Sequence, residues 1–219
     1  MRLTLALVLT LATASPLAAQ TRRPQARRPA VPAPAVSFRP FFLVSAEQPA
    51  ANKTFEAVFG QSLQQFWGGG VQVALRSGFY VEVEASRFKK TGQRAFVFNG
   101  QAFRLGIPLS ATIMPLELSA GYRFKVSPRL LPYAGGGIAR YSYTETSDFS
   151  DTGEDVDATH TGYLVLGGVE VRAHRWVGVS VDVQYTQVTG ILGGAGVSKE
   201  FGESNLGGTA VRLKVLVGR

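Results

Sequence analysis

Hydrophobic and polar residues alternate with a period of two through most of the chain beyond residue 36. In the clearest run, Val177 to Tyr185, four valines and a tyrosine share one face, while Gly, Ser, Asp and Gln occupy the other. This period is typical of β-strands whose two faces meet different surroundings. The sequence contains eight such runs. They cover residues 37–46, 69–77, 79–89, 111–124, 131–144, 161–172, 176–188 and 207–218.

The connections between these runs alternate in length. An even number of strands of about ten residues, with short turns at one end and long loops at the other, is typical of an outer-membrane barrel. Lipid offers no hydrogen-bond partners, so a sheet can cross it only by closing on itself. We therefore predict an all-β fold, an eight-stranded antiparallel up-and-down transmembrane β-barrel. The short connections are 77–78, 125–129 and 173–175, and the long ones are 47–68, 90–110, 145–160 and 189–206.

Two further elements are expected within the long loops. Residues 52–65 (NKTFEAVFGQSLQQ) give one short helix in the first long loop. Asn99-Gly100 predicts a two-residue type I′ turn, because both positions of that turn need positive φ. We expect the third and fourth strands to continue as a protruding hairpin over residues 93–106. Its register would place residue 88 opposite 111, with bulges or bends at Gly92 and Pro108.

A soluble eight-stranded barrel of the lipocalin type would alternate in the same way, with its apolar face inward. Two features favour the membrane version. All seven Tyr fall within predicted strands, and we expect most of them on the apolar face near strand ends, as in an interfacial aromatic girdle. The predicted polar face carries both signs of charge, which suits a closed interior where charges pair. These charges are Arg76, Arg123, Arg140, Arg172, Arg212, Lys214, Glu82, Glu84, Glu117, Glu170 and Asp182.

The first 35 residues differ in composition from the rest. Residues 1–20 predict a signal peptide, because Arg2 precedes an apolar run too short to span a bilayer. Residues 21–35 contain four Arg and four Pro and are expected to form a linker, which leaves 36–219 for the barrel. Five of the eight net positive charges come from Arg in the first 35 residues. The charge therefore does not indicate nucleic-acid binding by the folded part.

Few residues in this chain are candidates for catalysis. With no Cys and only His160 and His174, neither a cysteine site nor a multi-histidine metal centre is expected. A Ser-His-acid triad needs its groups close together, and the two His are predicted at opposite ends of the barrel. The carboxylates of residues 148–157 lack the spacing of a calcium loop. We therefore predict no enzyme activity, no catalytic or cofactor-binding residue, no cofactor and no metal site.

The stretch from Ile113 to Tyr143 resembles the strand–turn–strand of small eight-stranded outer-membrane proteins. A proline opens a strand that ends in Gly-Tyr-Arg-Phe at 121–124, and after a short turn Pro-Tyr-Ala-Gly-Gly-Gly follows at 132–137. This pattern is similar to the outer-membrane protein W and protein X families and to the transmembrane domain of outer-membrane protein A. The resemblance implies a place in the cell outer membrane, contact with its lipid and lipopolysaccharide, and insertion by the barrel-insertion machinery.

Two classes of function stay open at this point. The predicted polar face has six bases and five acids, and near balance favours a paired network that plugs the interior. That interior predicts a structural or surface-interaction protein, monomeric, with a surface protein partner at the 93–106 hairpin. The alternative, implied by the likeness to the protein W family, is a narrow channel or binder for a small molecule, including an apolar one.

Overall fold

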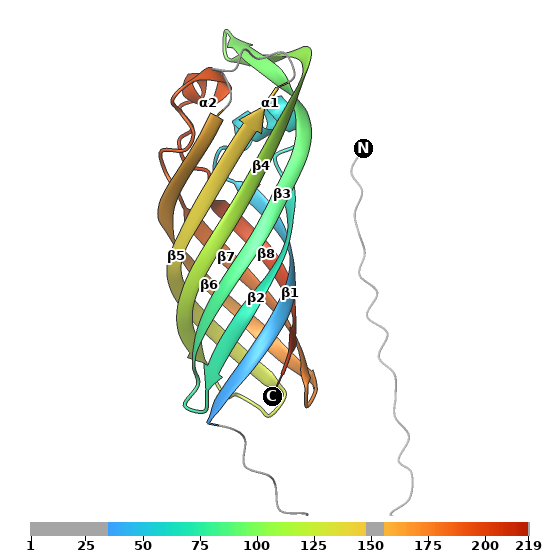
Figure 1. Cartoon of the computed structure of the whole chain (residues 1–219), viewed down its shortest axis with the longest axis vertical. Helices are drawn as coiled ribbons and strands as arrows, with labels where there is room; N and C mark the ends of the chain where they lie inside the picture. The colour runs from blue at the N-terminus through green and yellow to red at the C-terminus, as the bar shows by residue number, and fades with distance from the viewer. Residues whose placement is uncertain (1–34, 148–155, 219) are drawn as a thin grey trace, which may run out of the picture. The chain divides into compact units, whose positions relative to one another are not determined.

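The computed structural model describes residues 35–147 and 156–218. In this part of the chain, eight antiparallel strands form a closed barrel, in which each strand pairs with its sequence neighbours and β8 pairs with β1 (Figure 1). The strands are β1 (Val36–Pro49), β2 (Gln64–Leu75), β3 (Phe79–Phe98), β4 (Gln101–Arg123), β5 (Leu130–Thr146), β6 (Val156–His174), β7 (Val177–Gln187) and β8 (Gly208–Val217).

The two ends of the barrel differ. Short turns join β2 to β3, β4 to β5 and β6 to β7 at the end where β1 begins and β8 ends, here called the turn end. The opposite, loop end carries helices α1 (Asn52–Phe59) and α2 (Gly196–Glu200) (Figure 1). No helix in the described residues is long and apolar enough to cross a membrane.

The eight predicted strands are confirmed, and several extend further toward the loop end. β2 begins at Gln64 and β6 at Val156, five residues earlier than the alternation predicted in each case. The predicted helix over 52–65 is too long, because α1 ends at Gly60, whose φ of 79° is left-handed. Gln64 already pairs with Glu47 in the sheet. The predicted signal peptide, all but the last residue of the linker, and residues 148–155 of the acidic loop lie outside the described residues.

The outward face of the strands is apolar, as the membrane barrel requires and the lipocalin alternative does not. Valines such as Val83, Val181 and Val183 are about half exposed there. Aromatic side chains edge this apolar surface toward both ends, which is the arrangement of interfacial girdles. Toward the loop end they are Trp67, Tyr163 and Tyr185, and toward the turn end Phe79, Tyr122, Phe124 and Trp176.

Tyrosine placement corrects one expectation. Tyr80, Tyr133, Tyr141 and Tyr143 are buried inside the barrel, so most of the seven Tyr do not lie on the outer face. The interior uses their bulk as filling, and the Tyr133 hydroxyl donates a hydrogen bond to Asp182 at 2.6 Å. A tyrosine serves a polar lumen well, because its ring fills space and its hydroxyl satisfies a buried carboxylate.

Arg140 corrects a second expectation, because it lies on the outer face of β5. It is exposed and pairs with Leu116 and Thr161, while Ala139 and Tyr141 on either side of it point inward. The preceding tract, Gly135 to Gly137, has no side chains to reveal which face is buried. The alternation could therefore be read in either phase across this strand.

The hairpin of β3 and β4 confirms the predicted turn and corrects its register. Asn99 and Gly100 have φ values of 50° and 75°, as a type I′ turn requires, and Phe98 pairs with Gln101. The register shifts between Gln93 and Ala95, so Phe88 faces Ile113 and not Ala111. The extra residues of the bulge lie on β4 beside Pro108 and include Gly106, with φ of 74°.

Gly92 was predicted to mark a bulge or a bend, and it forms no bulge, because it pairs regularly with Leu109. Its lack of a side chain serves a close approach instead. A Cβ at this position would lie 2.5 Å from the Val58 carbonyl oxygen of α1. Gly92 thus lets the helix pack directly against the β3 backbone.

Glycine is also needed where neighbouring strands of the barrel approach each other closely. A Cβ on Gly137 would lie 2.0 Å from the Leu118 carbonyl oxygen, whereas a Cβ on Gly167 would have no heavy atom nearer than 3.8 Å. We expect Gly137→Ala to lower the free energy of unfolding by about 1–3 kcal/mol, the usual cost of overpacking. Gly167→Ala is the matched control and should stay close to wild type. Urea titration followed by heat-dependent gel mobility measures the stability of both variants. Equal losses of stability would contradict this account of the close approach between the strands.

Candidate functional site in the barrel interior

The centre of the barrel contains an ion-pair network that crosses the lumen. Arg212 of β8 donates from Nε to Asp182 of β7, and its Nη1 lies 3.3 Å from carboxylate oxygens of both Glu84 on β3 and Glu117 on β4. In the closed sheet β8 and β3 are separated by β1 and β2. These contacts therefore join opposite walls across the interior.

Lys214 extends the same network toward the turn end. Its ammonium group contacts Glu82 and Glu84, the latter at 2.9 Å, and sits 4.9 Å from the centre of the Phe41 ring. The Gln184 amide nitrogen donates to Glu117 at 2.9 Å. Burying these charges is tolerable because each has charged or hydrogen-bonding partners.

A second network lies at the turn end and centres on Glu170 of β6. Arg39 of β1 binds its carboxylate with two hydrogen bonds, and Arg123 of β4 donates to Oε2 at 3.0 Å. Gln72 connects the two networks, since it accepts from Arg39 and donates to Glu82. The residues named here are all buried: Arg39, Gln72, Glu82, Arg123 and Glu170.

The charged residues inside differ in part from those predicted. Eight of the predicted eleven are buried, but Arg140 faces outward, Arg76 is exposed just after β2, and the Arg172 side chain is about half exposed at 49%. Arg39 and Glu47 are buried and were not predicted. Among the described residues the buried charges are thus four bases and six acids: Arg39, Arg123, Arg212, Lys214, Glu47, Glu82, Glu84, Glu117, Glu170 and Asp182.

The missed residues had weak signals in the sequence. Arg39 stands between Phe38 and Pro40, with two Phe immediately after, so apolar residues occur on both faces of that run. Glu47 lies one residue beyond the predicted end of the first strand. Only the closed sheet shows that both side chains point into the lumen.

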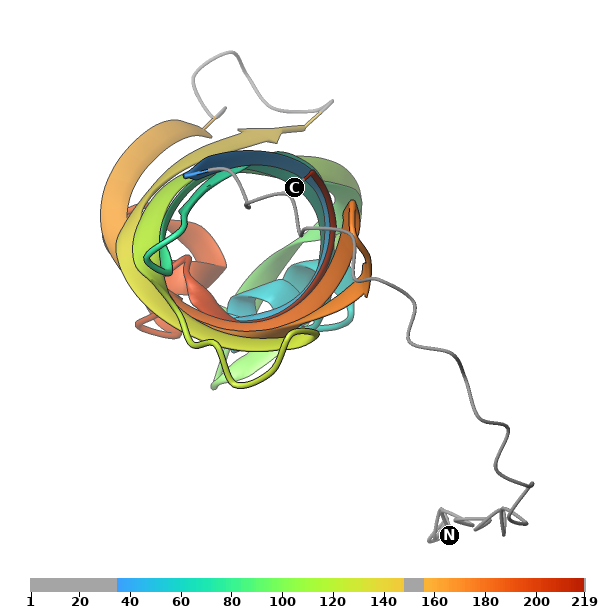
Figure 2. The ribbon, with the colours of Figure 1, turned by 90° about the horizontal axis from the view of Figure 1, so that it is seen from below.

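Toward the loop end the filling of the barrel is apolar and aromatic. Phe88 of β3 lies between Phe55 and Phe59 of α1 on one side and Phe66 of β2 on the other, with ring centres 5.3 to 6.4 Å away. Figure 2 shows α1 within the outline of the strands, on one side of this opening of the barrel. The buried apolar residues around it include Ala111, Ile113, Ala139, Tyr141, Leu164, Val188, Ile191 and Leu206.

Both ends of α1 are held by side chains from other loops. Its N-cap residue, Ala51, provides no side-chain cap, and Glu203 accepts hydrogen bonds from the backbone N–H groups of Lys53 and Thr54 instead, at 3.1 and 2.8 Å. At the other end Arg104 of the hairpin donates to the carbonyls of Glu56 and Ala57. An acid at the N-terminus and a base at the C-terminus both complement the helix dipole.

The two histidines lie at opposite ends of β6, as predicted. His160 is exposed toward the loop end, and His174 ends the strand beside the turn-end opening. Within the described residues no group of three or more His, Asp or Glu side chains is arranged to hold a metal ion. The predicted absence of catalytic residues remains a prediction.

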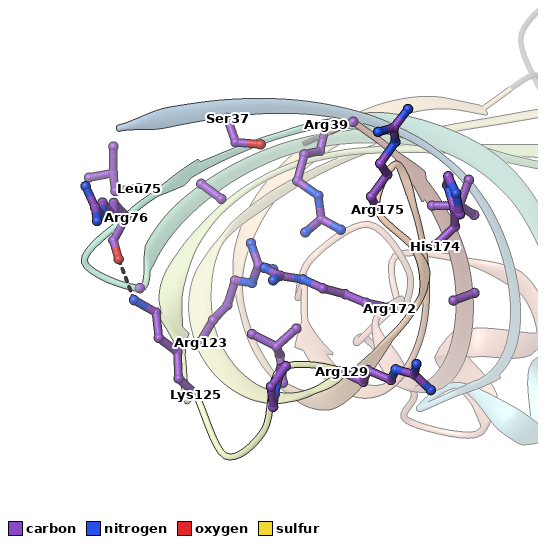
Figure 3. Close-up of a pocket in the computed structure, with 17 residues that line it drawn as sticks. Ser37, Arg39, Leu75, Arg76, Arg123, Lys125, Arg129, Arg172, His174 and Arg175 are labelled. Carbon is purple, nitrogen blue, oxygen red and sulfur yellow. Dashed lines mark hydrogen bonds between the residues drawn. The ribbon is translucent and has the colours of Figure 1, made fainter. Parts of the chain in front are cut away.

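A cavity of about 700 Å³ opens at the turn end below the Glu170 network (Figure 3). Its charged lining residues are all basic, six Arg and one Lys, with His174 beside them. Arg39, Arg123 and Arg172 point toward one another in its centre.

The closed barrel, its apolar girdled exterior and its charged lumen define an outer-membrane β-barrel protein. The chain belongs to the family of the outer membrane protein beta-barrel domain, which matches residues 4–216. It is therefore located in the outer membrane, where barrels of this kind direct their short turns to the periplasm.

Two solved structures are similar to this chain at low sequence identity. Neisserial surface protein A superposes with a TM-score of 0.52 at 14% identity, covering 84% of this chain and 97% of that one. The N-terminal barrel domain of OprF from Pseudomonas aeruginosa gives 0.48 at 13% identity over 84% and 97%. The comparison with curated proteins gave no match.

The central network predicts a large cost for removing its shared cation. Arg212→Met would leave Asp182, Glu84 and Glu117 close together without the guanidinium, and breaking a buried pair typically costs about 3–5 kcal/mol. Arg140→Met makes the same chemical change on the outer face and should cost less than about 1 kcal/mol. Unfolding in urea, followed by tryptophan fluorescence in detergent micelles, measures both. Similar losses for the two variants would show that Arg212 does not hold the network together.

Proposed function

We propose that this protein is a non-enzymatic, monomeric outer-membrane barrel with a closed interior, which serves as a structural element and a surface-interaction protein. The observation that carries the proposal is helix α1, held at both termini across the loop-end opening by Glu203 and Arg104. A helix fixed in this way covers the interior and leaves the neighbouring hairpin as the part that projects.

The contents of the lumen support closure. Eight strands leave an interior narrow enough for side chains to fill. From the turn end upward it holds the Glu170 network, the Arg212 network and then the aromatic packing around Phe88. A solute crossing the barrel would have to separate paired charges and displace α1. These contacts favour a plugged interior over a narrow channel or a binder of apolar molecules.

Single-channel recording in a planar bilayer tests closure. We expect no defined conductance from the wild type, and openings from the double variant Glu203→Ala/Arg104→Ala, in which both attachments of α1 are lost. Glu200→Ala/Arg87→Ala removes an acid and a base from exposed positions and should stay closed. Stable wild-type conductance that changes on Glu170→Gln would favour the channel instead.

The hairpin is the feature that supports a surface interaction. Beyond Arg87 no described strand pairs with the outer edge of β3, and the pairing of β4 with β5 begins only at Ser110. Both edges are therefore available for strand addition by another chain, apart from the parts of β3 that α1 and α2 contact and the Pro108 carbonyl of β4, which accepts a hydrogen bond from Ser147. Phe96 and Phe103 stack with ring centres 5.4 Å apart, and Phe98 is 63% exposed near the tip.

The hairpin's contribution is tested on cells that display the protein. We expect Phe98→Ser to reduce attachment to protein-coated surfaces, and Asn99→Val/Gly100→Val to abolish it, because valine disfavours the positive φ of the turn. Leu63→Ser, which removes an apolar residue that is also more than half exposed but lies outside the hairpin, is the control. If all variants attach like the wild type while heat-dependent gel mobility shows folded barrels, the hairpin is not an interaction surface.

A further inference from the structure

We propose that the turn-end cavity is a binding site for a phosphate group carrying two negative charges, reached from the periplasmic side. The site consists of Arg39, Arg123 and Arg172 around the opening below Glu170 (Figure 3). It is separate from the closed upper interior and does not depend on how the hairpin functions.

The first argument is charge. Arg39 and Arg123 both donate to the same Glu170 oxygen, at 2.8 and 3.0 Å, and the Arg172 Nε lies 3.9 Å from the other oxygen. One carboxylate thus faces three guanidinium groups, an excess of two positive charges. No acid lines the rest of the cavity, whereas Arg76 and Lys125 add positive charge at its rim. A ligand with two negative charges would balance the cluster.

The second argument is unused hydrogen-bonding capacity. Arg123 is only 6% exposed, yet its Nε has no hydrogen-bond partner among the described residues. Arg172 lies too far from Glu170 for a hydrogen bond, at 3.9 Å, and its guanidinium makes none to the described residues. Buried donors are normally satisfied. The Arg123 Nε is an exception and is closed off from solvent, whereas the half-exposed Arg172 guanidinium lines the cavity and can donate to a ligand inside it.

The third argument is shape. A carboxylate offers two oxygens in one plane, and those of Glu170 are already used by Arg39 and Arg123. A phosphate group offers three or more oxygens around one centre and can accept from guanidinium groups that approach from several sides. The cavity, about 700 Å³, also has room for a second phosphate or a small organic group.

Calorimetric titration with pyrophosphate tests the site, using the full chain refolded in a zwitterionic detergent at constant ionic strength. We expect Arg172→Gln to weaken binding about tenfold or more, as for loss of a charge-assisted hydrogen bond. Arg140→Gln, with the same loss of charge on the outer face, should bind like the wild type. Both variants keep the four Arg of residues 21–35, so background binding there cancels in the comparison.

Glu170→Gln separates binding from a purely structural role of the arginines. Removing the one acid should destabilise the barrel and yet tighten pyrophosphate binding, so that pyrophosphate raises the unfolding temperature more than in the wild type. A structural cluster alone predicts the destabilisation without the tighter binding. No binding at millimolar pyrophosphate, equal weakening by Arg140→Gln, or unchanged affinity in Glu170→Gln would each overturn the proposal.

The source of the phosphate is resolved by repeating the titration in nanodiscs. If a soluble phosphate compound is the ligand, the affinity for pyrophosphate should be the same in phosphatidylcholine discs and in discs that also contain phosphatidic acid. If a lipid headgroup occupies the site, phosphatidic acid should compete with pyrophosphate. If phosphatidic acid still competes with pyrophosphate in Arg172→Gln, the headgroup binds outside the turn-end cavity. The soluble phosphate compound then remains the ligand of the cavity.

Discussion

The contacts of Arg212 tie this barrel together, because one guanidinium neutralises carboxylates on three other strands. In a sheet, a shift of register by one residue moves every inward side chain to the outer face. Such a shift in β3 would place Glu82 and Glu84 in lipid and leave Lys214 with Asp182, 3.8 Å away, as its remaining acidic partner. The buried charges therefore specify how the strands pair, a role that apolar filling could not perform as selectively.

Helix α1 at the loop end is held by residues far apart in the chain. Helix α1 has eight residues and no side-chain cap of its own, so it is too short to be stable alone. It is held by Glu203, about 150 positions later, and by Arg104 on the hairpin. Because Arg104 belongs to the projecting arm of β4, a partner that pulled on the hairpin would also act on the C-terminal end of α1. The hairpin and α1 are thus mechanically linked through Arg104.

The sequence predicted those parts of the fold that local chemistry determines. Alternation located the eight strands, and Asn99-Gly100 located the hairpin turn, since positive φ is a property of those two residues. Long-range contacts decided the rest. The phase of β5 was hidden by three consecutive glycines, and so Arg140 was placed inside. Arg39 was hidden by apolar neighbours on both faces, and the hold of Glu203 on α1 has no local signature at all.

Charge is separated along the barrel axis, and this separation connects its two ends. The turn end has three guanidinium groups around one acid, whereas the remaining buried charges in the described interior are five acids and two bases. An anion entering from the periplasm would be attracted by the first group and then repelled by the second, before it met the apolar packing under α1. A cation entering from the same side would first be repelled by the turn-end arginines and then attracted by the acids further in. A lumen with both signs in series would hold an anion at its entrance and oppose its passage, so the proposed closed barrel and the proposed anion site at its periplasmic opening are physically compatible.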